Sequence, residues 1–239
     1  ESAHADHINH LHANSQQQSH TSDKKEHLEG VLEKYKVGSE NYTVSVTIKK
    51  DNSGITYNLQ VPGINIATSA LLAEIRNELV TTTTVSMKEL TDPEAFAQIK
   101  DRFAKEAVNV LKSRLPHIEQ PTQDFLVGKL MQDMLGLGEI EFLINDPSLE
   151  EIVIPCALEK VRVYTKKYGW VQTNIVIKTE EQIVNYSNII ARRVGRQITI
   201  LSPLLDAHLI SGDRINAVLY PINTKGTTIT IRKFARDPY

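Results

Sequence analysis

The strongest constraint on the fold is a pair of alternating, β-branched runs in the first half of the chain. They are YTVSVTIKK, which begins at Tyr42, and GITYNLQV, which begins at Gly54. The tetrapeptide DNSG joins the two runs and suits a tight turn, so together they predict a β-hairpin. Alternation of this kind buries one face of a sheet, and we expect a folded unit to begin at residue 39.

Two helices are expected after this hairpin, near residues 66–80 and 93–114. The second opens with Asp92–Pro93, residue types that suit a helix cap and a first turn. Apolar side chains recur along it at helical spacing and predict one buried stripe, made of Phe96, Ile99, Phe103, Ala107, Val110 and Leu111. Residues 39–118 are therefore predicted to form an N-terminal hairpin and helical unit.

The segment before this unit, residues 1–38, is polar and almost free of aromatic side chains. It has too little apolar surface to offset the entropy of ordering, and we expect a disordered His-rich tail or linker. Imidazole is a good ligand for transition metals, but the histidine spacing matches no fixed zinc pattern, so we expect no metal site. The histidines concerned are His4, His7, His10 and His12.

A second domain is expected at residues 119–235, after a proline-containing link at 115–121. A helix, a short helix and a strand come first. A hairpin turning near Gly169, an amphipathic helix and a final group of strands follow. This order predicts a PAS-like mixed α/β domain with an antiparallel sheet covered on one face, and an α+β class for the whole chain.

Composition and motifs exclude several classes of function. The chain has 27 Lys and Arg against 29 Asp and Glu, a formal charge of −2, which argues against a dedicated nucleic-acid binder. Its one cysteine, Cys156, excludes an intramolecular disulfide, and no apolar run reaches the roughly 20 residues of a spanning helix. Gly128–Lys129 lacks the context of a phosphate loop, and we expect no self-contained active site.

Arginines are the remaining candidates for chemistry. Arg214 and Arg232 each lie in an otherwise apolar strand, near residues 214–221 and 228–234. Such a side chain faces solvent, pairs with a carboxylate such as Asp206 or Asp213, or binds an anion, and the residues alone leave these interpretations open. A second group, Arg192, Arg193 and Arg196, ends the amphipathic helix. There a solvated or ion-pairing end is favoured over nucleic-acid contact.

Residues 121–235 resemble, in the order and spacing of their motifs, the N-terminal domain of the secretion superfamily ATPases. The motifs are LGLGEIEFLINDPSLEEIVI, VRVY in a hairpin, IIARRVGRQI, SPLLDAHLISGDRINAVLYP and TTITIRKF. These ATPases are the hexameric motors of type II and type IV secretion, type IV and Tad pili and the archaellum. The resemblance is greatest to the archaeal and Tad-like branch, in which a RecA-like catalytic domain with the phosphate loop follows this domain.

The resemblance implies that the sequence stops at the interdomain linker, with residues 236–239 as its start. ATP with Mg would lie between the two domains, and the fragment alone would bind no cofactor. By motif, the arginine of DRIN is Arg214 and that of TIRKF is Arg232, and both are expected to contact the phosphates. Arg193 and Arg196 are expected at a subunit interface.

The expected partners are the chain's own RecA-like domain, further subunits of a homo-hexamer and a membrane platform protein, with no nucleic acid. The resemblance implies a cytoplasmic protein, held at the inner face of the membrane through these partners. Ile154–Pro155–Cys156 departs from the pattern, because relatives often have an asparagine-glycine turn there. The alternative hypothesis is a PAS-like adaptor that binds a ligand or protein and has no ATPase activity.

Overall fold

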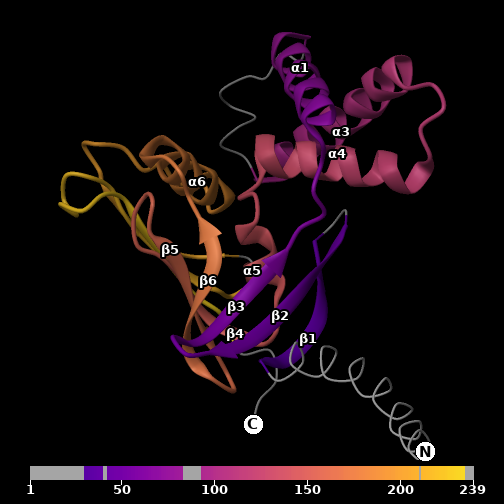
Figure 1. The fold of residues 1–239 in the computed structure, drawn as a ribbon. Helices are drawn as coiled ribbons and strands as arrows, with labels where there is room; N and C mark the ends of the chain where they lie inside the picture. Colours follow the sequence, from indigo (N-terminus) through magenta and orange to yellow (C-terminus); the bar gives the residue numbers. More distant parts are fainter. Residues whose placement is uncertain (1–29, 40–41, 83–92, 210, 235–239) are drawn as a thin grey trace, which may run out of the picture.

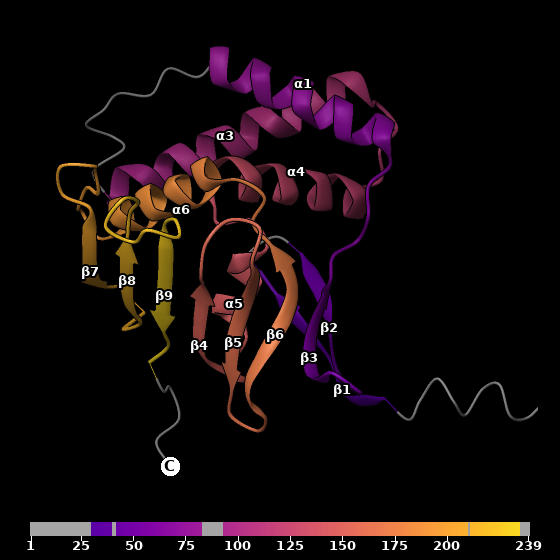
Figure 2. The same ribbon diagram turned by 60° about the vertical axis from the view of Figure 1, so that its left-hand side comes forward.

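The computed structural model describes residues 30–39, 42–82, 93–209 and 211–234. Within these residues a strongly curved sheet carries helices on one face and a helical cluster at one end (Figures 1 and 2). Nine described strands pair in the order β1-β2-β3-β6-β5-β4-β9-β8-β7. Their bounds are β1 Val31–Gly38, β2 Thr43–Asp51, β3 Gly54–Gln60, β4 Leu149–Ile154, β5 Lys160–Thr165, β6 Gly169–Val176, β7 Leu204–His208, β8 Arg214–Val218 and β9 Thr228–Arg232.

The α+β class is confirmed, and the predicted hairpin is β2 and β3. The structure corrects the predicted tail, because residues 31–38 form β1 and pair with β2. Residues 1–29, with the four histidines His4, His7, His10 and His12, lie outside the described residues.

The structure also corrects the predicted domain division at residues 118/119. Strand β3 pairs with β6 in parallel, through Thr56 with Gln172 and Tyr57 with Thr173, so the hairpin and the second domain share one sheet and one core.

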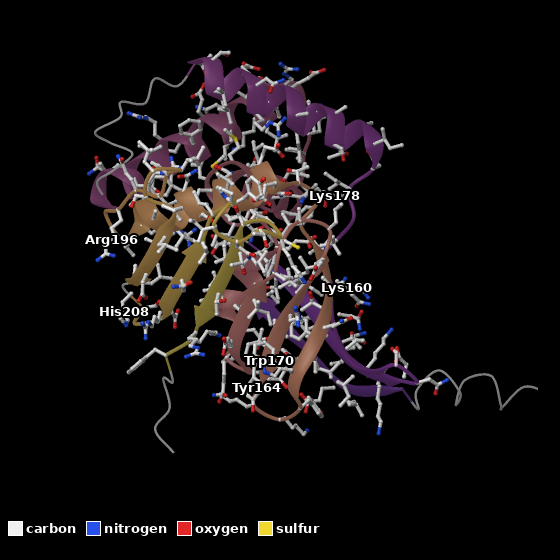
Figure 3. The ribbon with its side chains drawn as sticks, turned by 90° about the vertical axis from the view of Figure 1, so that its left-hand side faces the viewer. Lys160, Tyr164, Trp170, Lys178, Arg196 and His208 are labelled. Carbon is white, nitrogen blue, oxygen red and sulfur yellow. The ribbon has the colours of Figure 1, made fainter. Side chains whose placement is uncertain are left out.

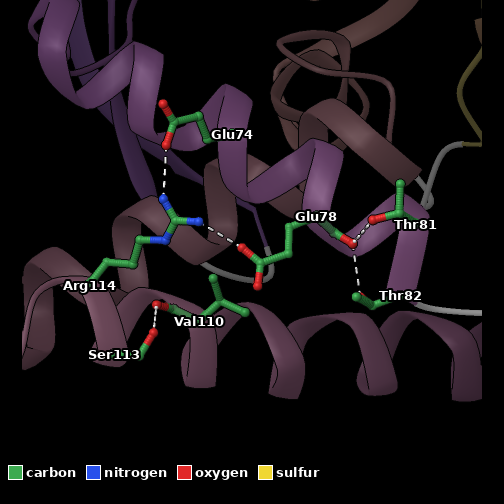
Figure 4. A network of polar contacts seen from close by, with 7 residues as sticks. All are labelled: Glu74, Glu78, Thr81, Thr82, Val110, Ser113 and Arg114. Atoms are coloured by element: carbon green, nitrogen blue, oxygen red, sulfur yellow. Dashed lines mark hydrogen bonds and ion pairs between the residues drawn. The ribbon is translucent and has the colours of Figure 1, made fainter.

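The helical cluster is formed by α1 (Ile66–Thr82), α3 (Pro93–Arg114) and α4 (Gln120–Leu135). The predicted stripe of α3 is buried at Ile99, Phe103, Ala107, Val110 and Leu111 and half-buried at Phe96. At its end, Arg114 donates to Glu74 and Glu78 of α1, each at 2.8 Å (Figure 4). Because α4 packs with α1 and α3, the helical cluster crosses the predicted domain boundary.

Two further helices cover the inner face of the sheet. Helix α5 (Ile140–Asn145) contacts β1 and β4 inside the curve, and α6 (Glu180–Arg193) packs against β9. Thr179 caps α6 by accepting from the backbone N–H of Gln182, and acidic and basic residues sit in its first and last turns, as its dipole favours. The opposite, outer face of strands β4 to β9 bears no helix in Figure 2.

A buried carboxylate fastens the N-terminal strands to this core. Asp146, fully buried, accepts from the hydroxyls of Tyr35 and Tyr57 at 2.8 and 2.7 Å. Its other oxygen accepts from the backbone and hydroxyl of Ser148 at 2.8 and 2.7 Å. The side chain of Lys233, next to the end of β9, donates to the Asp146 carbonyl. Asp146 is therefore the centre of a polar network that joins both halves of the sheet.

Candidate functional site

Strand alternation places the two candidate arginines on the outer face. Along β8, Ile215 and Ala217 are buried toward α6, and along β9 Ile229 and Ile231 are buried in the same way. Side chains one residue away point to the opposite side. Arg214 and Arg232 are accordingly exposed on the face that no described helix covers.

The register brings these two arginines together. Arg214 and Arg232 are direct partners across the β8–β9 ladder. Partners in an antiparallel pair have Cα atoms about 4.5–5.5 Å apart, and like charges placed opposite each other repel. Two guanidinium groups held side by side on an open face are suited to a multivalent anion that bridges them.

Arg214 has a carboxylate on its other side. Its Nε and Nη2 atoms donate to Oδ1 and Oδ2 of Asp206 on β7 at 3.1 and 2.9 Å. The hydrogen bond from Arg214 lowers the pKa of Asp206 and raises that of the arginine. Asp213, the other partner considered from sequence, is buried instead and accepts from the Ser211 hydroxyl and the backbone N–H of Phe234.

Arg232 has a carboxylate on the β4 side. Glu151 is its direct partner across the β4–β9 ladder, and the Arg232 Nε atom lies 3.4 Å from Glu151 Oε2. The side chain of Arg232 is 69% exposed and that of Glu151 is 21% exposed. Two neighbouring cations thus lie between two carboxylates, and the charges of the four groups balance.

The same row of partners continues across the sheet to two aromatic residues. Glu151 pairs with Tyr164 on β5, and Tyr164 pairs with Trp170 on β6. The two rings meet edge to face with centroids 5.5 Å apart, and Trp170 is 53% exposed. Figure 3 shows Tyr164 and Trp170 together on this face and His208 on the β7 side. We call this series of partners the outer row: His208, Arg214, Arg232, Glu151, Tyr164 and Trp170.

Sequence reasoning missed the aromatic half of the outer row. The segment VRVYTKKYGWVQT predicts a hairpin, and the hairpin is β5 and β6. Placing Gly169 at its turn pairs Tyr164 with Trp170, so the spacing of the two aromatics around the turn was the available signal. Their position beside Glu151 and Arg232 depends on the non-local pairing of β4 with β5 and β9.

The two arginines expected at an interface have different surroundings. Arg193 forms an ion pair with Glu141 of α5 on the inner side of the sheet. Arg196 lies near the outer row, where its Nη1 atom donates to the backbone oxygen of Asp206 at 2.7 Å (Figure 3). Arg192, whose pKa is lowered by burial, donates to the Asn188 carbonyl. The three arginines of RRVGR therefore contact three different partners and form no single basic patch in the described structure.

A pocket of about 620 Å³ lies in the helical cluster, separate from the outer row. It is bounded by the segment before α1, the start of α1, the α3–α4 link and the start of α4. Most of its lining is apolar, including Leu115, Pro116, Ile118 and Phe125, and His117 and Arg114 lie at it as well. This composition is typical of a site for a small, largely apolar ligand.

Other chemistry finds little support among the described residues. Cys156 is buried, and burial raises its thiol pKa, so it is a poor nucleophile. In the described ranges, no group of three or more His, Cys, Asp or Glu side chains could hold a metal ion. No described helix has both the length and the apolar character needed to span a bilayer.

Comparison with known proteins finds archaeal relatives. Three uncharacterised proteins of Methanocaldococcus jannaschii match this chain. The first is 28% identical over 213 residues, which are 88% of this chain. The second is 30% identical over 151 residues (63% of this chain), and the third is 28% identical over 149 residues (62% of this chain). The matches cover 28%, 26% and 58% of those proteins, so the chain spans about a quarter to three fifths of their length.

No protein-family model matches the chain. Among solved structures, the VirB11 ATPase from the Brucella suis type IV secretion system, in complex with sulphate, is similar over 40% of this chain and 29% of that chain. The sequence identity is 23% and the TM-score is 0.35.

Proposed function

We propose that this chain is the N-terminal, non-catalytic part of a hexameric ATP-hydrolysing motor for protein secretion or for pilus or archaellum assembly. In this proposal Arg214 and Arg232 contact the phosphates of ATP that lies between the sheet and a RecA-like domain of the same protein. The sequence supports it through the ordered motifs of residues 121–235, which end in DRIN and TIRKF.

The observation that carries the proposal is the direct pairing of Arg214 with Arg232 on the open face of the sheet. Both arginines belong to the two motifs for which the resemblance implies phosphate contacts, and the fold makes them neighbours. A guanidinium fork matches phosphate oxygens in two-point contacts, so two adjacent forks fit a polyphosphate. Lysine at either position is expected to be a poor replacement.

ATP with Mg would supply the phosphoryl group, and the arginines would neutralise the negative charge near its terminal phosphate. Because they stand on a sheet and not on a loop, a movement of this domain relative to its partner would shift both together. This arrangement suits the coupling of hydrolysis to domain motion. The catalytic loop and the metal ligands belong, in this proposal, to the partner domain.

The wider setting is proposed on the resemblance alone. It comprises a homo-hexamer in which Arg193 and Arg196 lie near subunit contacts, and a cytoplasmic location at the inner face of the membrane. A membrane platform protein would bind the N-terminal part of the chain, where the helical cluster offers a surface separate from the outer row.

The test is ATP hydrolysis by the parent protein with Arg214→Ala, Arg232→Ala and a control, Arg76→Ala. Arg76 is exposed on α1 in the helical cluster and far from the outer row. We expect each outer-row variant to reduce turnover about 10-fold or more while remaining a folded hexamer, since charge-stabilising contacts typically contribute that much or more. Normal turnover in both folded variants would refute the phosphate contacts.

The pocket of the helical cluster favours a second candidate, an adaptor that binds a small ligand and hydrolyses nothing. Native mass spectrometry of the purified chain separates the two. A retained small molecule that is lost in Phe125→Ala would support the adaptor, whereas a mass equal to the polypeptide alone would count against it.

A further inference from the structure

The outer row changes its chemistry in a fixed order along consecutive strands. From β6 to β8 the partners are two aromatic rings, one carboxylate and two guanidinium groups: Trp170, Tyr164, Glu151, Arg232 and Arg214. The phosphate contacts of the proposed function use only the last two. The aromatic pair and the carboxylate belong to the same exposed row and have no role in that proposal.

We propose that the outer row binds a nucleoside triphosphate lengthwise, with its base on the Tyr164–Trp170 pair, its ribose beside Glu151 and its phosphates on Arg232 and Arg214. The inference rests on the proposed function for the phosphate end and adds recognition of the nucleoside. It makes Trp170 and Tyr164 the residues that distinguish a nucleotide from a bare polyphosphate.

The dimensions of the sheet agree with such a ligand. Neighbouring strands lie about 4.8 Å apart, so measured along the sheet Trp170 is about 14 Å from Arg232 and about 19 Å from Arg214. An extended nucleoside triphosphate carries its base at one end, its phosphates at the other and the ribose between them. The order of aromatic, acidic and basic groups along the row is the order of their complements in that molecule.

The aromatic end is a suitable platform for a base. The edge-to-face contact with Tyr164, at 5.5 Å between centroids and 80° between planes, fixes the indole, while Trp170 stays 53% exposed. An exposed aromatic ring on a sheet is the usual stacking surface for a base, and such stacking accounts for roughly 5- to 100-fold in affinity.

Glu151 has the position and chemistry for the ribose. It stands between Tyr164 and Arg232 in the ladder, and its Oε2 atom is 3.4 Å from the Arg232 Nε atom. A carboxylate accepts several hydrogen bonds, and acidic side chains bind ribose hydroxyls in other nucleotide sites. The ion pair with Arg232 holds this carboxylate beside the proposed position of the phosphates.

The experiment is calorimetric titration of this chain with ATP, inorganic tripolyphosphate and adenosine. We expect ATP to bind at least 5-fold more tightly than tripolyphosphate. Trp170→Ala should remove this difference while leaving tripolyphosphate affinity unchanged, Trp170→Phe should restore most of it, and the control Tyr220→Ala, an exposed tyrosine outside the row, should change neither. Trp170 is the only tryptophan of the chain, so its fluorescence should be quenched by ATP and not by tripolyphosphate.

The outcomes separate this inference from the proposed function. If Arg214→Ala and Arg232→Ala weaken both phosphate ligands but Trp170→Ala weakens neither, the base platform is refuted and the phosphate contacts stand. If the arginine variants weaken neither ligand, or neither ligand binds this chain at millimolar concentration, the lengthwise site is refuted. The phosphate contacts of the proposed function are then decided by ATP hydrolysis in the parent protein with the same variants. If a single-stranded oligothymidylate bound more tightly than ATP, with a steep dependence on salt, the ligand of the outer row would be nucleic acid and not a nucleotide.

Discussion

Replacing Tyr57 with phenylalanine tests whether the Asp146 network fastens the N-terminal strands to the rest of the sheet. Tyr57 and Asp146 are both fully buried, and the hydroxyl donates to Asp146 Oδ2 at 2.7 Å. The variant keeps the ring and removes one hydrogen bond to a charged acceptor, a loss of about 1.5–3 kcal/mol. Because no water can replace the missing donor at a fully buried site, we expect the upper part of this range, about 2–3 kcal/mol.

The assay is thermal and urea unfolding followed by circular dichroism. A domain of roughly this size loses about 2–4 °C of melting temperature per kcal/mol, so Tyr57→Phe should lower it by roughly 4–12 °C. Tyr35→Phe is the comparison variant: the Tyr35 hydroxyl donates to the same Asp146 oxygen at 2.8 Å and also lies 2.8 Å from the Ser148 hydroxyl, but Tyr35 is only half-buried. Water can then replace part of the lost bond, and a loss of about 1 kcal/mol is expected. Equal losses, or a larger loss for Tyr35→Phe, would refute the explanation by burial.

Two further predictions concern Asp206 and Cys156. Arg214→Ala should raise the pKa of Asp206 toward its ordinary value, because the hydrogen bond from Arg214 lowers that pKa in the wild type. NMR titration of the Asp206 carboxyl measures the change. An unchanged pKa would show that the ion pair does not persist in solution. In the wild type the pairing is therefore present at neutral pH and is lost as the pH falls through the lowered pKa of Asp206. Cys156 should react with a thiol reagent at pH 8 at least ~10-fold more slowly in the native protein than in urea, because it is buried with a raised pKa; equal rates would contradict its burial.

The elements that sequence predicted well are those with strong local periodicity. The hairpin β2–β3 and helix α3 lie where the runs from Tyr42 and the apolar stripe of α3 place them. The sequence does not distinguish strand β1 from a disordered tail, because it is an edge strand whose alternate residues are exposed, including Lys34 and Lys36. Polar edge strands are common, since lysine on an edge discourages pairing with other chains, and composition alone does not separate them from a tail.

The division into units could not be read from sequence, because it depends on pairing between distant segments. Strand β3 pairs with β6 more than 100 residues later, and that parallel contact joins the hairpin to the second domain. Helix α4 also crosses the predicted boundary. It follows that boundary in sequence, but it packs with α1 and α3, which precede it. The prolines at the α3–α4 link indicate a turn, but they do not show which elements each helix packs against.

For the candidate site, part of the answer was available from the period of the strand. Asp213 immediately precedes Arg214, so strand alternation turns its side chain to the opposite face and leaves Asp206 as the partner. The pairing of Arg214 with Arg232 needed the register of two strands that a loop connects, and motif order alone does not give a register.

The same register explains why the site can be altered without loss of the fold. Arg232 and Lys233 are consecutive, and alternation turns one to the outer row and the other to the Asp146 carbonyl. The buried network therefore fixes the backbone that presents Arg232, while the guanidinium itself is mostly exposed and contributes little to burial. Substitutions in the outer row should act on ligand affinity with little effect on stability, and substitutions around Asp146 should act on stability first. A variant such as Tyr57→Phe that weakened phosphate binding at a temperature where it is fully folded would show that the network also sets the position of the arginines.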